Sequence, residues 1–511
     1  MNKDFHYYGT YVAARLAGYG FEDAQKVAHT AQYVDDSVHA MLDANCLEGI
    51  KNPIPTSHSE REFDNNFSGK KWNESFLDET ARVWPIFHFL PGNLREREKY
   101  EGPFTDEGLL NWNYDDEAKE QFKLLCLPNS QLVKQMVSQL REDNSLYAMG
   151  IAMHVLTDTW AHKYYSGVPA WFTNRSEEFK NLSSATKLEV SMPDWFAYNS
   201  FFYLGHASAG HWPDLPYMRY EYKCNWRKKT IIKDNPSDFM SAFKQMVEAI
   251  FKSKNGQSFD INKYYSLDST TEEIIKRIFE TQENDQTQTW KRYIPEIKVY
   301  GKSLEVPVDY DANLWLKQAR EIVKNDPAKK KETDYYKFNL AAINHFNYIN
   351  EQLHQSQIYL DTTPKERILR CKIKVNNDEY ISASKDIYPS FGKTPVILEL
   401  IFPNNNSFTV GTNVKIRTTE TNVGGKKYLG AWTDSLGVLY YYTKDYYLFN
   451  QKWSIEQGNK EAGSPIDFTQ PVTIKNQAFK NEPYIKATSL LRRKYFILTS
   501  SKQSFYLEKC E

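Results

Sequence analysis

The chain has 511 residues, 41% hydrophobic and 25% charged, so it is long enough for two or three domains and too apolar to be disordered. Its 64 Lys and Arg nearly balance 65 Asp and Glu, which gives no electrostatic reason to expect long nucleic acid as a partner. Its five scattered cysteines exclude a disulfide framework and a zinc–thiolate site, so any metal ligands must be His and carboxylate.

Residues 1 to about 357 are predicted to be mostly helical. Gly18 and Gly20 separate the first two expected helices, and an apolar stripe at helical spacing marks the helix at residues 144–165. Residues 46–104 contain five prolines and are expected to be rich in loops. The expected helices cover residues 5–17, 22–44, 129–139, 144–165, 193–205, 237–253, 271–285, 311–325 and 335–356.

After residue 357 the helical periodicity gives way to short strand-like runs, which predicts a separate all-β domain at residues 366–511. An aliphatic-x-aliphatic run followed by Tyr-aliphatic-x-Ala occurs three times, beginning at Cys371, Val414 and Val472. This repeat resembles a β-trefoil, and Gln451-Lys452-Trp453 resembles the Gln-x-Trp element of carbohydrate-binding trefoils. A β-sandwich with evenly spaced strands is the alternative.

The strongest chemical signal is His154-x3-Asp158-x3-His162. On a helix, positions i, i+4 and i+8 lie along one ribbon of surface, where two imidazoles and a carboxylate can converge on a metal ion. The neighbouring stripe is apolar, so these polar groups are expected to face the interior and to need partners. The structural alternative is a hydrogen-bonded His/Asp face without an ion.

A second signal is the Gly/Pro-rich segment that contains His206, His211 and Asp214. Its glycines allow the backbone to approach an ion closely, although histidines at a helix end can also bind carbonyl groups. Further candidates are His6, His88 between apolar residues, and Asp35, Asp36 and His39 in one expected helix, where Asp35 and His39 share a face at i, i+4. Each of these is by itself more often structural.

Their distribution favours a shared site, because nine of the eleven histidines lie between His6 and His211 and none lies in the β domain. Ligands from several helices of one bundle are how polynuclear carboxylate–histidine sites are built. The sequence therefore predicts a cluster of two or three divalent ions, zinc first among them, with ligands drawn from His6, Asp35, Asp36, His39, His88, His154, Asp158, His162, His206, His211 and Asp214.

These motifs, together with Asn344-His345-Phe346, make residues 1 to about 356 resemble an uncharacterised bacterial family related to the zinc-dependent phospholipase C and single-strand-specific nuclease superfamily. The resemblance implies an all-helical fold around three zinc ions. It also implies that Asp158 bridges two ions, and that His162 and His206 serve the third ion with His211 or Asp214. Those enzymes also use the amino group of an N-terminal Trp, which this chain lacks, and a longer spacing after the aspartate.

The predicted function is metal-dependent phosphodiester hydrolysis of a phospholipid or nucleotide substrate. Two neighbouring ions would activate water, with Asp158 as a bridging ligand and Asp35 or Asp36 as a second carboxylate or general base. The alternative is a structural metal bundle that carries a glycan- or protein-binding trefoil, and a combination of the two would suit an exported toxin or effector. No signal peptide or apolar run of membrane-spanning length is visible, which predicts a cytoplasmic location or export by a signal-independent route.

Overall fold

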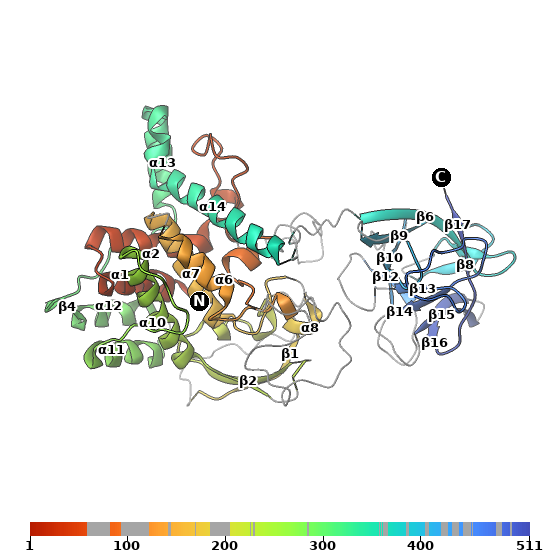
Figure 1. Ribbon diagram of the computed structural model, residues 1–511, viewed down its shortest axis with the longest axis horizontal. Helices are drawn as coiled ribbons and strands as arrows, with labels where there is room; N and C mark the ends of the chain where they lie inside the picture. The colour runs from red at the N-terminus through yellow and green to blue at the C-terminus, as the bar shows by residue number, and fades with distance from the viewer. Residues whose placement is uncertain are drawn as a thin grey trace. The chain divides into compact units, whose positions relative to one another are not determined.

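In the computed structural model the chain divides into two compact units, Met1–Thr362 and Thr363–Glu511. The first unit is mainly helical and the second is an antiparallel sheet, so the predicted order of a helical part followed by an all-β part is confirmed (Figure 1). The structure describes residues 1–58, 82–92, 122–141, 145–168, 170–183, 205–224, 226–227, 230–283, 286–356, 358, 360, 366–384, 388–403, 408–420, 428–431, 439–442, 451, 453–476, 483–490 and 493–510.

The first unit opens with the two helices that the sequence predicted. A π-helical turn, η1 (Asp4–Gly9), runs directly into α1 (Thr10–Leu16), and α2 (Phe21–Asp36) follows the turn at Gly18. Gly18 has a φ of 92°, a conformation that side chains disfavour, so glycine is suited to this turn. The chain thereby reverses and brings residues of η1 beside the end of α2.

The helix α2 ends at Asp36, earlier than predicted. Ser37 leaves the helical conformation, and its carbonyl oxygen accepts a hydrogen bond from the backbone N–H of Thr56 at 2.8 Å. His39 therefore lies in a separate 3₁₀ turn, η2 (His39–Met41). The prediction that Asp35 and His39 share one helical face is wrong, because the helix does not extend to His39.

Most of the other predicted helices are present, with ends shifted by a few residues. Serine side chains cap two of them: Ser130 Oγ accepts from Val133 N, and Ser145 Oγ accepts from Tyr147 N. The helix predicted at residues 193–205 lies outside the described residues, apart from Gly205. The remaining helical elements are α6 (Gln131–Gln139), α7 (Leu146–Ala161), α8 (Trp171–Asn174), η3 (Ala207–Ala209), η4 (Trp212–Asp214), α10 (Asn235–Lys254), α11 (Ser269–Glu280), α12 (Gln286–Tyr293), η5 (Ile294–Glu296), α13 (Leu314–Asn325), η6 (Pro327–Glu332) and α14 (Asp334–Gln355).

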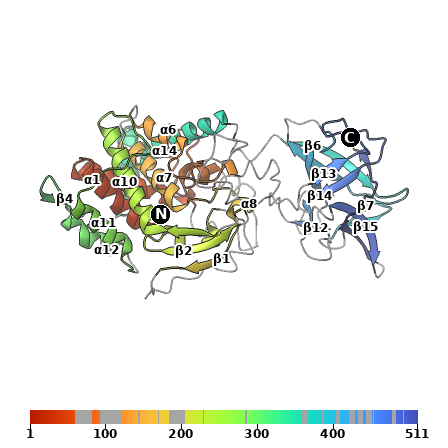
Figure 2. The ribbon, with the colours of Figure 1, turned by 60° about the horizontal axis from the view of Figure 1, so that its bottom comes forward.

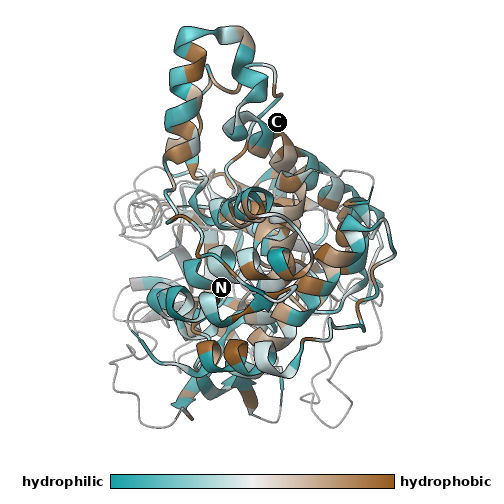
Figure 3. Cartoon of the chain, turned by 90° about the vertical axis from the view of Figure 1, so that its left-hand side faces the viewer, coloured by the Kyte–Doolittle hydropathy of each residue, from teal (hydrophilic) through white to brown (hydrophobic). Residues whose placement is uncertain are grey.

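The helix α7 is the central helix of the first unit. It packs against α2, α10 and α14, and all its residues from Met149 to Ala161 are buried. Several helices of the first unit carry hydrophilic and hydrophobic residues on the same element (Figure 3). Gly150 lets α2 approach closely, since a Cβ at this position would lie 2.4 Å from Thr30 Cβ. Polar residues of α7 have no route to water on an outer face, so they need partners inside the unit.

A small antiparallel sheet in the first unit was not predicted. Its strands are β1 (Ser176–Asn181), β2 (Arg219–Cys224) and β3 (Ile231–Asp234), in that order, and β1 and β2 lie side by side (Figure 2). The sequence of β1 is mostly polar and lacks a clear two-residue alternation, so the pattern gave no strand signal. A two-stranded hairpin of β4 (Lys298–Val299) and β5 (Lys302–Ser303) is also present.

The described residues of the second unit form a twelve-stranded antiparallel arrangement. Six of these strands pair with one another in the order β17, β6, β9, β10, β13 and β14. A β-bridge joins Val472, next to β14, to Phe505, next to β17. The bridge closes the six strands into a ring. The strands are β6 (Glu366–Lys374), β7 (Tyr380–Ser382), β8 (Ser390–Gly392), β9 (Leu398–Pro403), β10 (Asn413–Thr418), β11 (Tyr428–Ala431), β12 (Leu439–Tyr442), β13 (Trp453–Glu456), β14 (Thr473–Asn476), β15 (Tyr484–Leu490), β16 (Arg493–Thr499) and β17 (Tyr506–Lys509).

The sequence repeat falls on corresponding strands of this unit. The aliphatic runs form β6, β10 and β14, and the tyrosine that follows each run begins β7, β11 and β15. In each copy the tyrosine pairs with the first strand, through Lys374–Tyr380, Arg417–Tyr428 and Lys475–Tyr484. Within the described residues of the whole chain, no helix combines the length and the apolar character needed to cross a membrane.

Candidate metal centre

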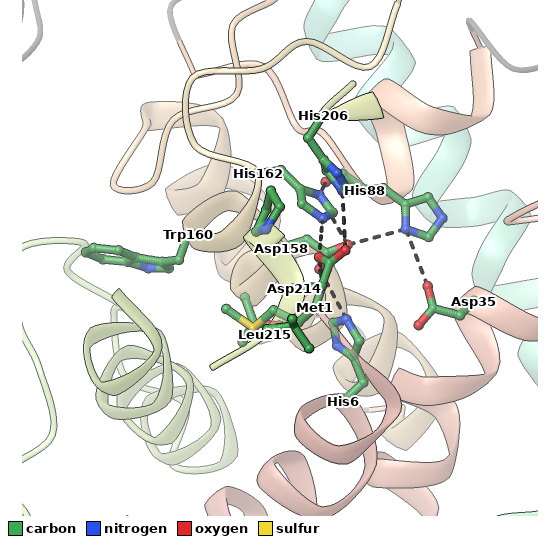
Figure 4. Close-up of polar contacts among 12 residues, drawn as sticks. Met1, His6, Asp35, His88, Asp158, Trp160, His162, His206, Asp214 and Leu215 are labelled. Carbon is green, nitrogen blue, oxygen red and sulfur yellow. Dashed lines mark hydrogen bonds and ion pairs between the residues drawn. The ribbon is translucent and has the colours of Figure 1, made fainter. Parts of the chain in front are cut away.

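Side chains from the C-terminal half of α7 and from four other parts of the first unit converge around Asp158 (Figure 4). The helix α7 contributes His154 and Asp158, and His162 caps its C-terminal end. The other members are His6 from η1, Asp35 from the last turn of α2, His88 from the described segment 82–92, and His206 and Asp214 beside the 3₁₀ turns η3 and η4.

The two carboxylate oxygens of Asp158 face different sets of histidines. Oδ1 lies 3.1 Å from His6 Nε2, whereas Oδ2 lies 3.2 Å from His154 Nε2 and 3.3 Å from His88 Nδ1. His88 Nδ1 and His154 Nε2 are themselves 3.2 Å apart. Ligand atoms about 2 Å from one ion lie about 3.3 Å apart in tetrahedral geometry, so these side chains have a spacing that could hold a metal ion.

Asp214 organises a second set at the C-terminal end of α7. Its Oδ1 lies 3.1 Å from His162 Nε2, and its Oδ2 lies 3.4 Å from His206 Nε2. Asp35 approaches the first set from α2, with Oδ1 3.7 Å from both His88 Nδ1 and His154 Nε2. Three groups of side chains are thus suited to hold a metal ion: His6, Asp35 and His154; His88, His154 and Asp158; and His162, His206 and Asp214.

Backbone carbonyl groups fix which ring nitrogen of four histidines carries hydrogen. A carbonyl oxygen can only accept a hydrogen bond, so the ring nitrogen that faces it must donate. These contacts join His88 Nε2 to Thr56 O at 2.9 Å, His154 Nδ1 to Ala31 O at 2.8 Å, His162 Nδ1 to His88 O at 2.7 Å and His206 Nδ1 to Gly210 O at 2.9 Å.

The other ring nitrogen of each of these histidines faces a carboxylate. His88 Nδ1 and His154 Nε2 lie 3.2 Å apart, and both approach Oδ2 of Asp158. Burial lowers the pKa of His88, but its hydrogen bond to Asp158 and the charge of Asp35 raise it above its usual value. A proton on one of the rings or a metal ion among the three atoms would supply the positive charge that they favour. Orientation of a histidine by a carbonyl group at its far nitrogen is also the usual arrangement around protein-bound metals.

A cation already occupies part of this cluster, namely the α-amino group of Met1. It lies 2.6 Å from Asp158 Oδ1 and 3.2 Å from Asp214 Oδ1 and is fully buried. Burial opposes its charge, but the carboxylates of Asp158, Asp214 and Asp35 outweigh this effect and raise the pKa of the amino group to about 11. The ammonium group stands in for positive charge that the carboxylates require, which fits a metal-binding role for them.

Burial raises the pKa of each carboxyl group in the cluster, and nearby positive charge lowers it, so the balance of the two effects decides the direction of the shift. Burial acts to raise the pKa of Asp158, but the Met1 ammonium and nearby histidines hold it well below its usual value. The same ammonium and His206 hold the pKa of Asp214 low against burial. For Asp35 the effect of burial prevails over His154 and His88, and its pKa is raised.

His6 is the least satisfied member of the cluster. Its side chain is fully buried and stacks on His154 with ring centroids 3.9 Å apart, and neither of its ring nitrogens has a partner in hydrogen-bonding geometry. Burial, His154 and the Met1 ammonium lower its pKa well below the usual value, so the ring is neutral. A buried neutral imidazole 3.1 Å from a carboxylate oxygen is suited to bind a shared ion.

Comparison with protein-family models gives one match. Residues 1–353 match a family of unknown function, DUF6765. The chain belongs to this family. The match confirms that the helical part of the sequence belongs to an uncharacterised family, and it covers every member of the metal cluster.

Comparisons beyond the DUF6765 family add little. A search of curated protein sequences gives no match. Among solved structures, the lysenin pore and the complex of lysenin with phosphocholine are 16% and 17% identical, each over 28% of this chain, with TM-scores of 0.21. The matches span 46% and 45% of those chains. The S. cerevisiae protein O-mannosyltransferase Pmt1–Pmt2 complex bound to the sugar donor is 11% identical, over 97% of this chain and 65% of that chain, with a TM-score of 0.20. Likenesses this weak define no shared fold.

Three of the predicted ligands of this DUF6765 member lie apart from the cluster. The carboxylate of Asp36 accepts hydrogen bonds from Tyr310 and Gln32. His39 is exposed, with its ring 6.2 Å from that of His58. His211 is exposed at the start of η4 and belongs to none of the three groups.

Two contributors to this DUF6765 site were not predicted from the sequence. The amino group of Met1 is one, because a backbone amino group leaves no pattern of residue types. Gln32 lies one helical turn before the two aspartates and donates to Asp35 Oδ2 at 3.4 Å and to Asp36 Oδ2 at 3.0 Å. The i, i+3 and i, i+4 spacing of Gln32 with Asp35 and Asp36 was a usable signal.

Proposed function

We propose that this chain is a metal-dependent phosphodiester hydrolase whose catalytic unit is Met1–Thr362. The observation that carries the proposal is the convergence of His88 Nδ1, His154 Nε2 and Asp158 Oδ2, which lie 3.2–3.3 Å from one another. A metal ion bound among these three atoms would satisfy all of them. The resemblance of the sequence motifs to the zinc phospholipase C and nuclease superfamily supports the choice of reaction.

Asp158 is the proposed bridging ligand, because its two oxygens face two different donor sets. Oδ1 would serve the ion nearest His6, and Oδ2 the ion nearest His88 and His154. His162, His206 and Asp214 would hold a further ion. Imidazole and carboxylate donors without thiolates suit zinc well and also admit other divalent ions.

The proposed chemistry uses two neighbouring metal ions. When bound, they would lower the pKa of a water molecule, which makes it a nucleophile, and their positive charge would stabilise the negative charge on the phosphoryl oxygens. The protein's own contribution is to hold the donors in place. Asp35 would supply the second carboxylate, since its Oδ1 lies 3.7 Å from both His88 Nδ1 and His154 Nε2.

The proposed substrate is a phospholipid head group or a nucleotide phosphodiester. A nitrophenyl phosphodiester reports on either activity, and phospholipid vesicles and nucleotides then separate the two substrates. We expect turnover that zinc restores after a chelator removes it. Asp158→Asn should abolish turnover, and Asp260→Asn, at an exposed aspartate remote from the cluster, should leave it unchanged. Wild-type protein with zinc bound and no turnover on any of these substrates would refute the hydrolase.

We also propose that Thr363–Glu511 is a β-trefoil that binds a glycan or a protein. The support is the ring of paired strands together with three sequence repeats that occupy corresponding strands. Glycan-array binding by the full chain tests the glycan part of this proposal. Binding should be equal in the wild-type chain and in Asp158→Asn, because Asp158 belongs to the other unit, Met1–Thr362. Binding that disappears with Asp158→Asn would place the ligand elsewhere.

A further inference from the structure

The carboxylate of Asp35 is held by a chain of hydrogen bonds that begins almost three hundred residues later in the sequence. Tyr310 lies between β5 and α13, and its hydroxyl donates to Asp36 Oδ2 at 2.7 Å. Gln32 Nε2 donates to the same oxygen at 3.0 Å and to Asp35 Oδ2 at 3.4 Å. We propose that Tyr310 is a positioning residue for the metal-binding carboxylate of Asp35 and acts through Asp36 and Gln32. This inference rests on the proposed metal centre.

The amide group of Gln32 links the two carboxylates. A primary amide has two N–H donors, and here one is directed at each aspartate. Gln32 is 4% exposed, so water competes little for these hydrogen bonds. Because Oδ2 of Asp35 is engaged by Gln32, Oδ1 is the oxygen left to face His88 and His154.

Asp36 acts in this chain as an anchor for Gln32. Its Oδ2 accepts from both Tyr310 and Gln32, and Asp36 belongs to none of the three metal-binding groups. Two adjacent aspartates in the last turn of α2 are electrostatically unfavourable, since the C-terminal end of a helix carries partial negative charge. The hydroxyl of Tyr310 and the amide of Gln32 offset this cost at Asp36.

The segment that carries Tyr310 is itself fastened to the N-terminal helices. Tyr7 donates its hydroxyl to Val308 O at 2.5 Å, and Tyr11 donates to Glu305 O at 2.7 Å. Gln25 Oε1 accepts from Val308 N at 3.0 Å. These contacts fix the position of the Tyr310 hydroxyl, so that it can set the position of Asp36.

The test is the zinc affinity of Tyr310→Phe, which removes one hydroxyl and keeps the ring. The control is Tyr335→Phe, which removes a hydroxyl that donates to Met41 O at 2.6 Å and contacts no member of the cluster. Loss of an outer hydrogen-bond partner typically weakens metal binding by about 10–100-fold. We expect that loss for one ion in Tyr310→Phe, with the other ions and the control at wild-type affinity.

Competition with a chromogenic chelator measures each affinity on protein that circular dichroism shows to be folded. Asp36→Asn keeps an acceptor for Tyr310 and should bind zinc better than Asp36→Ala. Wild-type affinity for every ion in both folded Tyr310→Phe and folded Asp36→Ala would overturn the proposal. This readout does not use turnover, so zinc-binding protein without hydrolase activity would refute the proposed function and leave the role of Tyr310 standing.

Discussion

The backbone carbonyl oxygen of His88 accepts a hydrogen bond from His162 Nδ1 at 2.7 Å. One candidate ligand therefore orients the ring of another, and the two belong to different metal-binding groups. His88 directs its own Nδ1 toward Asp158 at 3.3 Å, while His162 directs Nε2 toward Asp214 at 3.1 Å. A displacement of His88 should thus disturb both groups, which makes the cluster one connected site.

The two buried carboxylates should differ in how much metal they control. Asp158 faces histidines of two groups, whereas the histidines that Asp214 faces in the described part of the chain, His162 and His206, belong to one group. We expect Asp158→Asn to reduce bound zinc by more than one ion per chain and Asp214→Asn to remove one ion. Elemental analysis of protein purified without a histidine tag measures both. Equal losses in the two variants would contradict the bridging role of Asp158.

Zinc should stabilise the folded chain, and the gain should rise with the logarithm of the zinc concentration once this exceeds the dissociation constant. A ligand that binds only the native state at about 100 times its dissociation constant adds about 2.7 kcal/mol. Without zinc, the Met1 ammonium is the cation nearest to Asp158 and Asp214, and Asp35 keeps a raised pKa. Thermal unfolding of chelator-treated protein should shift upward on addition of zinc. An identical shift in Asp158→Asn would show that the stabilising site is elsewhere.

Gly150→Ala should destabilise the first unit and weaken metal binding together. A Cβ at this position would lie 2.4 Å from Thr30 Cβ and 2.6 Å from Val27 O, so α2 and α7 would have to separate. Overpacking of this kind costs about 1–3 kcal/mol. The separation would also move Asp35 away from His154, so zinc titration should show a weaker affinity for zinc than in the wild type.

Gly9→Ala is the matched control for that variant. Its added Cβ would lie 3.4 Å from the nearest atom, in the ring of Trp290, which is an ordinary contact. Chemical denaturation should give this control a free energy of unfolding close to that of the wild type, because Gly9 already has helical φ and ψ angles that alanine also adopts. A Gly150→Ala variant as stable as this control would mean that the helices tolerate the extra methyl group.

The stability of the first unit should fall as the pH falls from about 6.5 to about 4, in part through His29. Burial beside Tyr310 and Trp315 lowers the pKa of His29 to about 4, despite the opposing effect of Asp334 and Asp311. In the unfolded chain the pKa is about 6.5, so between these values only the unfolded state binds the proton, and protonation favours unfolding.

The variant His29→Phe isolates this contribution. The difference in pKa corresponds to at most about 3 kcal/mol at pH 4, and the variant should lack this loss while keeping an aromatic ring in contact with Trp315. Denaturant unfolding at pH 7 and pH 4.5 measures the difference. The same pH dependence in both proteins would assign the acid sensitivity to other groups.

Local periodicity explains what could be predicted about the metal centre. The spacing of His154, Asp158 and His162 predicted one ribbon of a helix, and the helix α7 with its C-cap carries these residues. The alignment of these three residues depends only on the rise and turn per residue of a helix, and residues close in sequence determine whether a helix forms. The repeat of Tyr380, Tyr428 and Tyr484 likewise predicted strands, because short aromatic and β-branched runs carry a local signal.

Composition and local periodicity predicted imidazole and carboxylate donors without thiolates, in a helical part that precedes an all-β part. Which aspartate faces the cluster depends on contacts between distant segments of the chain. Asp35 and Asp36 are neighbours with the same side chain, and they differ because α2 ends at Asp36 and because Tyr310, distant in sequence, engages only one of them. The tertiary structure likewise brought Met1 to Asp158, since a contact between distant residues depends on how the helices pack and leaves no local pattern.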